Sequence, residues 1–412
     1  MKNRIAFCVG EWNEHMSNHR FNLLTLQELI DVLHVSRSTI DRWRKHKGLP
    51  FIKIGKEIFF DKEKVEDWIH SQETVIDTEK NKSASHETKT IKIGYQSKTA
   101  HMWSPLIIKK LGLLEEELQD INPSRKNDVE WCNATNGLEL VEGMIAGNIH
   151  IASLGDYPII LSNQLSKIFP NYHPVLLGFD GKTAQSKGIS IVLPKGVGYQ
   201  EIGDLTGGTI STVMNSSAGY RLNRLLAGRE HADVEIVHQD MNLSFQSIME
   251  KGVGASVMWE PYVSLLQTQG ANCITFEDAD DYLTGLVTQD HWAQMNEDVV
   301  IAYMKAHLRA HHIAQKYPLR VAKIVSKCTD IDFQIAVKII SNVRWDAAVY
   351  RKDLQTLQNL SQYNSRGINL NGENTFKDRF RGYYLGEASK RMNLSRCVEN
   401  PLEGSWDTEI LY

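Results

Sequence analysis

Residues 25–44 read TLQELIDVLHVSRSTIDRWR. Thr25 and Glu28 stand at the two positions of a capping box, in which each side chain binds the other residue's backbone and starts a helix. Ser36 is placed to cap a second helix after a short break. The apolar residues of the first helix recur at helical spacing and form one stripe: Leu26, Leu29, Ile30 and Leu33. The stretch predicts two short helices joined by a tight turn.

The second helix has two distinct faces. Ile40 and Trp43 are expected to point inward. Ser38, Thr39 and Arg42 then share the outward face. A short helix, a tight turn and a helix with small polar and basic residues outside is the helix-turn-helix arrangement.

Residues 51–60, FIKIGKEIFF, contain two short alternating runs around Gly55. This pattern predicts a β-hairpin, or wing. Asp61 is placed to cap a third helix. The residues expected to pack that helix against the first two are Val65, Trp68 and Ile69.

The order of these elements, with Gly48-Leu49-Pro50 before the wing, resembles the excisionase-type, MerR-like winged helix-turn-helix family over residues 21–70. The resemblance implies that the second helix enters the major groove of double-stranded DNA and that the wing lies beside it. Family wings often carry arginine near the positions of Phe59 and Asp61, so fewer wing contacts are expected here. The implied DNA-binding residues are Arg37, Ser38, Thr39, Arg42, Arg44, Lys53 and Lys56.

Local charge agrees with DNA binding. Between positions 36 and 56 there are seven basic residues and one acidic residue, Asp41. Each phosphate that is neutralised contributes about −0.9 to the salt slope of binding. The alternative is a three-helix protein-interaction domain with a solvated basic face. Tight DNA binding by so small a module is expected to require a homodimer on paired half-sites.

Composition restricts the class of protein. The chain of 412 residues has 46 basic and 50 acidic side chains, and this net charge of −4 excludes a protein that coats nucleic acid over its whole surface. Five scattered cysteines without Cys-x-x-Cys spacing indicate reduced thiols. The polar residues 1–20 lack the apolar run of an export signal, and no apolar stretch is long enough to cross a membrane. A cytoplasmic protein without a membrane partner is expected.

The chain divides into four parts by composition. Residues 1–20 are expected to be irregular, and residues 21–72 form the winged helix-turn-helix domain. Residues 73–89 are polar and predict a flexible linker, with a helix continuing from Trp68 as the competing interpretation. Residues 90–412 form the large domain.

In the large domain, short apolar runs alternate with helical patterns. The predicted strands and helices are 91–95, 103–114, 128–131, 137–147 and 149–153. This alternation predicts an α/β sheet covered by helices on both faces.

Five segments of this domain resemble, in order, the class II periplasmic-binding-protein family, in its aliphatic-sulfonate, taurine and nitrate branch. The segments are Ile93–Gln96, Ser153–Pro158, Lys187–Lys195, Gly208–Gly219 and Val257–Tyr262. The resemblance implies two lobes that close on a small solute. Lobe 1 is expected over about 90–182 and 283–412, and lobe 2 over about 183–282. The predicted fold class is therefore multi-domain: a small winged helix-turn-helix domain followed by a two-lobed α/β periplasmic-binding-protein class II domain.

The resemblance also implies a ligand site. Ser216 and Ser217 open a predicted helix, where backbone amides and hydroxyls suit a sulfonate, phosphonate or carboxylate. Asp156 is expected either to hold an ammonium or hydroxyl group or to cap a helix. For Trp259 the alternative is core packing. The implied ligand-binding residues are Gln96, Asp156, Ser216, Ser217, Ala218, Trp259 and Glu260.

Two departures from the family bear on the ligand. Met214 and Asn215 replace its usual basic-glycine pair, which predicts a less cationic cradle. His101, Met102 and Trp103 are bulkier than the small residues common after the first ligand loop. They are expected either to shape a pocket for a compact or aromatic ligand or to pack the start of a helix.

Catalytic and metal motifs are not predicted. His307 and His311 have a helical spacing that can bind metal, but without a carboxylate motif beside them a surface face is favoured. The sequence lacks a Walker loop, a Gly-x-Ser-x-Gly elbow, a Cys/His nucleophile arrangement and the cysteine-rich motif of the thiamine-pyrimidine synthases. Neither an enzyme, nor a metal, nor another cofactor is expected.

Together these features predict a one-component transcription regulator. A small solute, sulfonate-like or taurine-like, binds in the large domain and changes how a homodimer presents its DNA-binding helices. Two alternatives stay open: a substrate-binding component of an ABC transporter, and an excisionase-like architectural DNA-binding factor. No function is predicted for the segment after Phe376.

Overall fold

The computed structural model describes residues 23–33, 37–46, 48–55, 57–65, 68, 90–121, 128–198, 208–227, 234–276, 279–364, 376, 378–394 and 399–406. The predictions for 1–20 and 73–89 lie outside these residues. The chain forms two compact units, residues 1–86 and 87–412. No helix in the described ranges is both long and apolar enough to cross a membrane.

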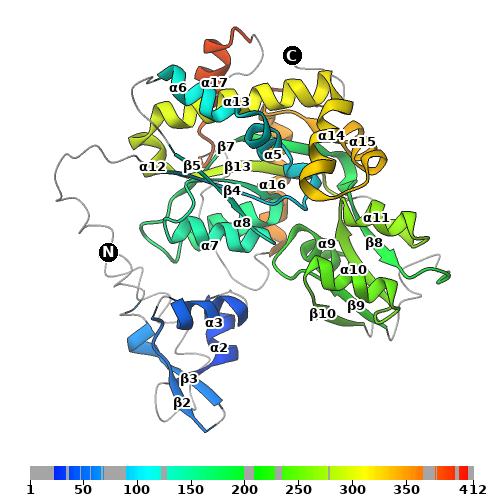
Figure 1. The fold of residues 1–412 in the computed structure, drawn as a ribbon. Helices are drawn as coiled ribbons and strands as arrows, with labels where there is room; N and C mark the ends of the chain where they lie inside the picture. Colours follow the sequence, from blue (N-terminus) through cyan, green and yellow to red (C-terminus); the bar gives the residue numbers. More distant parts are fainter. Residues whose placement is uncertain are drawn as a thin grey trace. The chain divides into compact units, whose positions relative to one another are not determined.

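The smaller unit contains a helix-turn-helix with a hairpin (Figure 1). Its elements are, in order, β1 (Leu23–Thr25), α2 (Leu26–Leu33), α3 (Arg37–His46), β2 (Ile52–Ile54) and β3 (Glu57–Asp61). β3 pairs antiparallel with both other strands, in the order β1-β3-β2. The predicted hairpin is confirmed. β1 was not predicted, because its three residues are too few to carry an alternating pattern.

The predicted capping box starts α2. The backbone N–H and the hydroxyl of Thr25 donate to Glu28 Oε2 at 2.8 and 2.9 Å, and the Glu28 N–H donates back to Thr25 Oγ1 at 3.2 Å. Ile40 and Trp43 are buried as predicted, and the Trp43 and Trp68 ring centres are 5.6 Å apart. The core of this unit also contains Leu24, Leu29, Leu49, Phe60 and Val65.

The larger unit contains two sheets, each with its own apolar core. The sheet of lobe 1 has six strands in the order β14-β7-β13-β6-β4-β5. These are β4 (Ile91–Tyr95), β5 (Val129–Asn133), β6 (Ile151–Gly155), β7 (Pro174–Thr183), β13 (Tyr282–Gln289) and β14 (Arg344–Trp345). β4 runs parallel to β5 and β6, whereas β13 runs antiparallel to β6 and β7, so the sheet is mixed.

Helices cover both faces of this sheet, as the alternating pattern predicts. In Figure 1, α5 (Ser104–Leu111) and α13 (Glu297–Lys316) lie on one side of the sheet. α7 (Gly137–Ile145) and α8 (Asp156–Leu165) lie on the other. α8 begins directly after β6, and α7 begins after a short turn that follows β5. The first residues of both helices therefore lie at the edge of the sheet.

Residues 103–114 do not form the single helix that their pattern predicts. Gly112 takes a positive φ of 67°, which ends α5 and lets a second helix begin at Leu113. The other helical segments of lobe 1 are η2 (Ala100–Met102), α6 (Leu113–Ile121), α12 (Asp290–Met295), α14 (Pro318–Thr329), α15 (Phe333–Asn342), α16 (Arg351–Asn364) and α17 (Gly382–Arg391).

The sheet of lobe 2 has five strands in the order β10-β9-β11-β8-β12. These are β8 (Ile189–Leu193), β9 (Thr209–Thr212), β10 (Glu235–His238), β11 (Ala255–Trp259) and β12 (Asn272–Thr275). β9 runs parallel to β10 and β11, and β8 runs antiparallel to β11 and β12. Its helices are α9 (Ser217–Leu226), α10 (Met241–Met249) and α11 (Tyr262–Thr268).

The chain passes between the lobes at two adjacent positions. β7 ends at Thr183, and the chain enters lobe 2 after η3 (Ala184–Ser186). It returns to lobe 1 at Tyr282, the first residue of β13. Thr183 and Tyr282 are partners in the β7–β13 pairing, so the two crossings lie side by side. Two neighbouring crossings are a geometry on which lobes can hinge.

Candidate functional site

The first candidate site is α3 in the smaller unit. Arg37 and Lys45 are exposed on this helix, where they are available to DNA phosphates. Arg44 is held in place, because its guanidinium donates to Asp41 at 2.7 Å and lies 4.2 Å from the centre of the Phe51 ring. The other predicted readers in α3 have side chains outside the described part of the chain: Ser38, Thr39 and Arg42.

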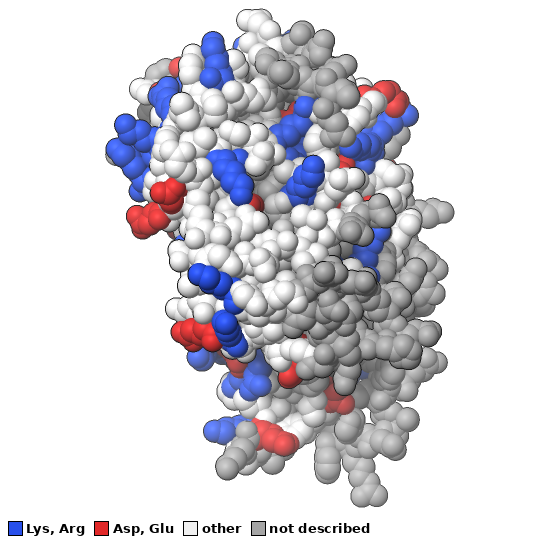
Figure 2. Space-filling view, turned by 90° about the vertical axis from the view of Figure 1, so that its right-hand side faces the viewer, with Lys and Arg blue, Asp and Glu red and all other residues white. Residues whose placement is uncertain are grey.

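The hairpin contributes fewer basic groups. Lys53 is exposed on β2, and Lys56 falls outside the described residues. Asp61 accepts a hydrogen bond from the Lys64 N–H at 3.3 Å, as expected of a helix cap. On the face that Figure 2 shows, basic side chains are separated by acidic and uncharged ones.

The second candidate site lies where the two lobes of the larger unit meet. Asp156, the first residue of α8, is fully buried and paired with Arg221 of α9. Arg221 Nη2 donates to Asp156 Oδ2 at 2.8 Å, and Nη1 donates to Oδ1 at 3.3 Å. The other acceptors of this guanidinium are Ser186 Oγ, the Ser217 carbonyl and the Asp281 carbonyl. We call Asp156 and Arg221 the interlobe pair.

Arg221 was not among the predicted ligand residues. It follows Ser217 by four residues, so on α9 the two share one face, and that spacing was a usable signal. A guanidinium thus lies six residues after Asn215 of the Met214-Asn215 departure, which had predicted a less cationic cradle. Asp156 holds this cationic group, while Gly155 occupies the N-cap position of α8.

The predicted helix start at 216–217 is confirmed. Ser216 caps α9, because its Oγ accepts a hydrogen bond from the Gly219 N–H at 3.1 Å. A Cβ placed on Gly155 would come within 2.7 Å of Ser217 Oγ, so the two lobes are in close contact at this point. Ala218 is buried in the same turn.

The first predicted ligand loop is packed by its own side chains. Gln96 is buried, with its Nε2 donating to Met102 Sδ at 3.3 Å and its Oε1 accepting from Thr99 Oγ1 at 3.3 Å. Trp103 Nε1 donates to the Ser97 carbonyl at 2.9 Å. Of the two expectations for the bulky residues here, packing of the helix start is the one observed for Trp103.

Trp259 and Glu260 join lobe 2 to this loop. Trp259 Nε1 donates to the Lys98 carbonyl at 3.1 Å, and the Ala100 N–H donates to the Glu260 carbonyl at 2.9 Å. The Glu260 carboxylate accepts from the N–H and the hydroxyl of Ser264, at 3.0 and 2.8 Å, at the start of α11. Trp259 belongs to the apolar core of lobe 2, which was the alternative expectation for this residue.

Two buried rings flank the interlobe pair. The Tyr282 ring centre lies 5.2 Å from the Arg221 guanidinium carbon and 4.5 Å from the His101 ring centre. His101 Nε2 is 3.1 Å from Thr183 Oγ1, whose own hydrogen goes to the Lys187 carbonyl, so Nε2 is the donor. Burial, and then the Arg221 charge, lower the pKa of His101 to about 3, which keeps the imidazole neutral.

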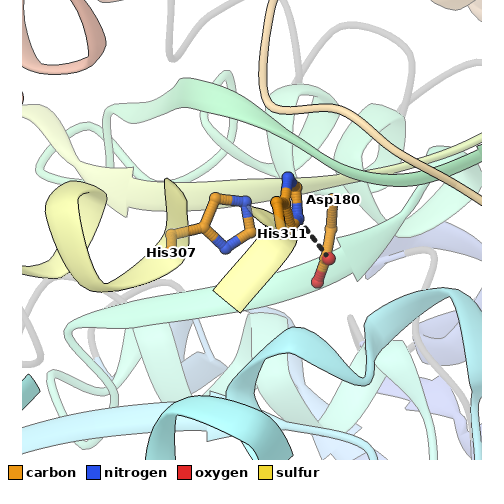
Figure 3. A group of neighbouring side chains, drawn as sticks. All are labelled: Asp180, His307 and His311. Atoms are coloured by element: carbon orange, nitrogen blue, oxygen red, sulfur yellow. Dashed lines mark hydrogen bonds and ion pairs between the residues drawn. The ribbon is translucent and has the colours of Figure 1, made fainter. Parts of the chain in front are cut away.

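The surface position expected for His307 and His311 is wrong. Both are fully buried on α13, whereas the adjacent His312 is exposed. The reason is that α13 packs against five other helices, α5, α6, α12, α14 and α17, which leave little of its circumference to solvent. Both imidazoles lie beside Asp180 of β7 (Figure 3).

Each unit contains a segment that matches a known family. Residues 23–73 match the family described as helix-turn-helix domain, and residues 181–320 match the family described as NMT1/THI5 like. A protein of Escherichia coli (strain K12), whose name proposes aliphatic sulfonates as its ligands, is 24% identical over 208 residues. The match covers 49% of this chain and 59% of that protein, so it spans little more than half of the relative's length.

Solved structures resemble the larger unit. The alkanesulfonate-binding protein SsuA from Xanthomonas axonopodis pv. citri, bound to MOPS, has a TM-score of 0.59 at 16% identity and covers 72% of this chain and 99% of its own. The periplasmic nitrate-binding protein NrtA from Synechocystis PCC 6803 has a TM-score of 0.58 at 14% identity, covering 74% and 89%. The chain joins a helix-turn-helix domain to a solute-binding-protein fold. These relatives are binding proteins by name, and their likeness at such identity shows the fold alone.

Proposed function

We propose that this protein is a one-component transcription regulator that binds double-stranded DNA and senses a small solute. The union of a helix-turn-helix domain with a solute-binding fold in one chain supports this function. The observation that carries it is the interlobe pair, whose opposite charges are buried and come from different lobes. A solute that engages both charges changes how firmly the lobes hold together.

The interlobe pair also favours a class of ligand. Breaking a buried ion pair on one side costs about 3–5 kcal/mol, because the other charge is left uncompensated. A ligand that enters between Asp156 and Arg221 therefore has to supply two charges. A small zwitterion of the taurine type does so, with its sulfonate toward the guanidinium and its ammonium toward the carboxylate. A sulfonate without an ammonium leaves Asp156 unpaired and is expected to bind more weakly.

The DNA response is proposed to act through a homodimer. One helix-turn-helix module buries little surface, so two modules on paired half-sites are needed for tight binding. Closure of the lobes on ligand changes how the dimer presents its modules. A coupling free energy of about 1–3 kcal/mol would change DNA affinity roughly 5–150-fold.

Ligand binding is tested by isothermal titration calorimetry on the full chain with taurine, ethanesulfonate and nitrate. Taurine is expected to bind most tightly, and Arg221→Gln and Asp156→Asn are each expected to weaken its binding at least tenfold, since 1.4 kcal/mol already gives a factor of ten. Arg320→Gln, exposed on α14, is the matched control and leaves binding unchanged. Equal binding of taurine by wild type and both interlobe variants contradicts the proposed site.

DNA binding is tested by selecting bound fragments from random duplexes and measuring their affinity at several salt concentrations. Arg37→Ala and Lys53→Ala are each expected to reduce the salt slope by about 0.9, whereas Lys110→Ala, exposed in the larger unit, leaves it unchanged. Failure to bind duplex DNA at low ionic strength contradicts the regulator and favours the transport alternative. DNA affinity that is identical with and without a bound solute contradicts sensing and favours the architectural alternative.

A further inference from the structure

A second group of charged side chains lies in the core of lobe 1 (Figure 3). His307 and His311 are one turn apart on α13 and face Asp180 of β7, and all three are fully buried. One ligand atom from each lies within 4.8 Å of the others, and the two imidazole centres are 4.0 Å apart. We propose that Asp180, His307 and His311 bind one divalent transition-metal ion.

The hydrogen bonds of His307 determine which of its nitrogens is available. Nε2 lies 2.9 Å from the Phe179 carbonyl oxygen, which can only accept, so Nε2 carries the hydrogen. In the neutral ring Nδ1 then keeps a lone pair, as a metal ligand requires.

Ser104 cannot satisfy both of its neighbours. Its Oγ is 2.7 Å from Asp180 Oδ2 and 3.1 Å from His307 Nδ1, and both of these atoms are acceptors. A hydroxyl has one hydrogen, so one of the two acceptors has no donor from Ser104. Asp180 Oδ2 also accepts from Ser153 Oγ at 3.1 Å, so both acceptors have a donor when Ser104 donates to His307. Hydroxyls and imidazoles thus surround the buried Asp180 carboxylate among the described residues, and a metal ion or a proton can supply the positive charge.

His311 faces Asp180 through Nε2, which is 3.1 Å from Asp180 Oδ1, so His311 would bind a metal ion through Nε2 and carry its hydrogen on Nδ1. Its Nδ1 is buried with no hydrogen-bond partner among the described residues. The hydroxyl of Tyr303, two turns before His311 on the same face of α13, is likewise buried without a described partner. The nearest cation along β7, Lys182, is committed to Asp353 at 2.7 Å.

The donor set indicates the kind of ion. Two imidazole nitrogens and one carboxylate oxygen suit Zn²⁺ and neighbouring first-row metals. Zn²⁺ binds such atoms at about 2.0–2.2 Å, so ligand atoms in a tetrahedral site are roughly 3.3–3.6 Å apart. The three ligand atoms lie within 4.8 Å of one another, so the two that are farthest apart would have to approach by at most about 1.5 Å. Small side-chain rotations achieve this. Because all three ligands are buried, the ion would stabilise the fold rather than act on a substrate.

The competing occupant is a proton shared by Asp180 and His307 across Ser104. Burial raises the pKa of Asp180 to about 6, so a proton is a realistic alternative to the metal. A shared proton would join Asp180 and His307 but would not involve His311, whose Nε2 lies 3.1 Å from Asp180 Oδ1. The convergence of both imidazoles on one carboxylate favours the metal.

The test uses the full chain without an affinity tag, produced in medium supplemented with Zn²⁺ and washed with a chelator. Inductively coupled plasma mass spectrometry is expected to find about one equivalent of a first-row metal per chain. Asp180→Asn and His311→Gln are each expected to lower metal affinity at least tenfold. Mutation of residues that only hydrogen-bond to metal ligands already lowers affinity roughly 10–100-fold. His312→Gln, at the exposed neighbouring histidine, is the matched control and keeps the metal.

Refolding gives a measurement that does not depend on the variants. Wild-type chain unfolded with chelator and refolded with Zn²⁺ is expected to unfold at a higher temperature than chain refolded without it. Less than about a tenth of an equivalent of metal in wild type, together with no Zn²⁺ effect on refolding, overturns the proposal in favour of the shared proton. Equal metal in wild type and folded Asp180→Asn overturns it in favour of adventitious binding elsewhere.

Discussion

Lys182–Asp353 and Arg221–Asp156 are both buried ion pairs, but they connect different parts of the molecule. Their closest N···O distances are 2.7 and 2.8 Å, and the exposed fraction of all four side chains is 4% or less. The first pair joins β7 to α16 within lobe 1. The second joins α8 to α9 across the lobe boundary. The two pairs have similar distances and burial, but only Arg221–Asp156 can separate by hinge motion of the lobes.

The surroundings of the two pairs reinforce this difference. Lys182 Nζ lies 4.6, 5.0 and 5.9 Å from the ring centres of Phe179, Tyr350 and Trp406. Trp406 also donates to Asp353 Oδ1 at 2.7 Å. Water reaches this pair only if lobe 1 unpacks. Water reaches the interlobe pair when the lobes part, with each core left intact.

Lys182→Met is expected to have the largest effect, because it leaves Asp353 buried without its cation. The free energy of unfolding should fall by about 3–5 kcal/mol. Urea denaturation followed by tryptophan fluorescence measures the loss. Lys110→Met, at an exposed position on α5, is the control and should change stability by no more than about 0.5 kcal/mol. Equal losses in the two variants would mean that the Lys182–Asp353 pair does not stabilise lobe 1.

Trp406→Phe tests whether the segment 399–406, for which the sequence predicted no function, completes this pair. The variant keeps an aromatic ring but removes the donor to Asp353, so a loss of about 1.5–3 kcal/mol is expected for a hydrogen bond to a charged acceptor. Trp292→Phe is the control, because Trp292 is half-buried and stacks on His150 with ring centres 4.6 Å apart. A loss no greater than that of the control would assign Trp406 a packing role alone.

These two pairs also show how far the sequence could be interpreted. Local signals predicted local structure: Thr25 and Glu28 form the capping box, and Ser216 caps α9. The charge partners were not predicted, because Arg221 is 65 positions from Asp156 and Asp353 is 171 positions from Lys182. Helical and strand periodicity indicates which face of an element is buried. It does not indicate which distant charge the fold brings to that face.

The histidines of α13 are a second case in which the sequence pattern did not show what the fold brings to a helix face. His307 and His311 lie on a helix that also carries Lys305 and Arg309, so a solvated face was the reasonable expectation. Their buried hydrogen-bond partners are Asp180 and Ser104, which come from a strand and a helix far along the chain. The fold class could thus be inferred from patterns and resemblance, whereas the polar clusters inside the fold could not.

Arg221→Gln is expected to destabilise the chain less than Lys182→Met. The remaining Asp156 carboxylate can be hydrated when the lobes part, so the loss should be about 1–3 kcal/mol. Small-angle scattering should show a larger radius of gyration for Arg221→Gln than for wild type, and no increase for folded Lys182→Met. Asp156→Asn, which removes the other charge, should match Arg221→Gln in both measurements. If Arg221→Gln is as destabilising as Lys182→Met and stays compact, the two pairs are equivalent and the distinction fails.

His101 is expected to make the lobe boundary sensitive to acid. Burial, and then the Arg221 charge, lower its pKa from 6.5 to about 3. Below pH 6.5 the unfolded chain takes up a proton that the folded chain does not, so stability falls as the pH drops from 6.5 toward 3. At pH 5.5 the loss from this one group is about 1.4 kcal/mol relative to neutral pH.

His101→Gln isolates this contribution, because the variant cannot take up that proton in either state. His307 and His311 also have pKa values lowered to about 3 by burial, so they add to the acid sensitivity of both proteins and cancel in the comparison. Urea denaturation at pH 7.5 and 5.5 should show a pH dependence smaller by about 1.4 kcal/mol in the variant. A protonated imidazole would face the Arg221 guanidinium across the Tyr282 ring, so acid should weaken the interlobe contact before it affects the Lys182–Asp353 pair. If His101→Gln has the same pH dependence of stability as wild type, protonation of His101 does not control the acid sensitivity of the lobe boundary.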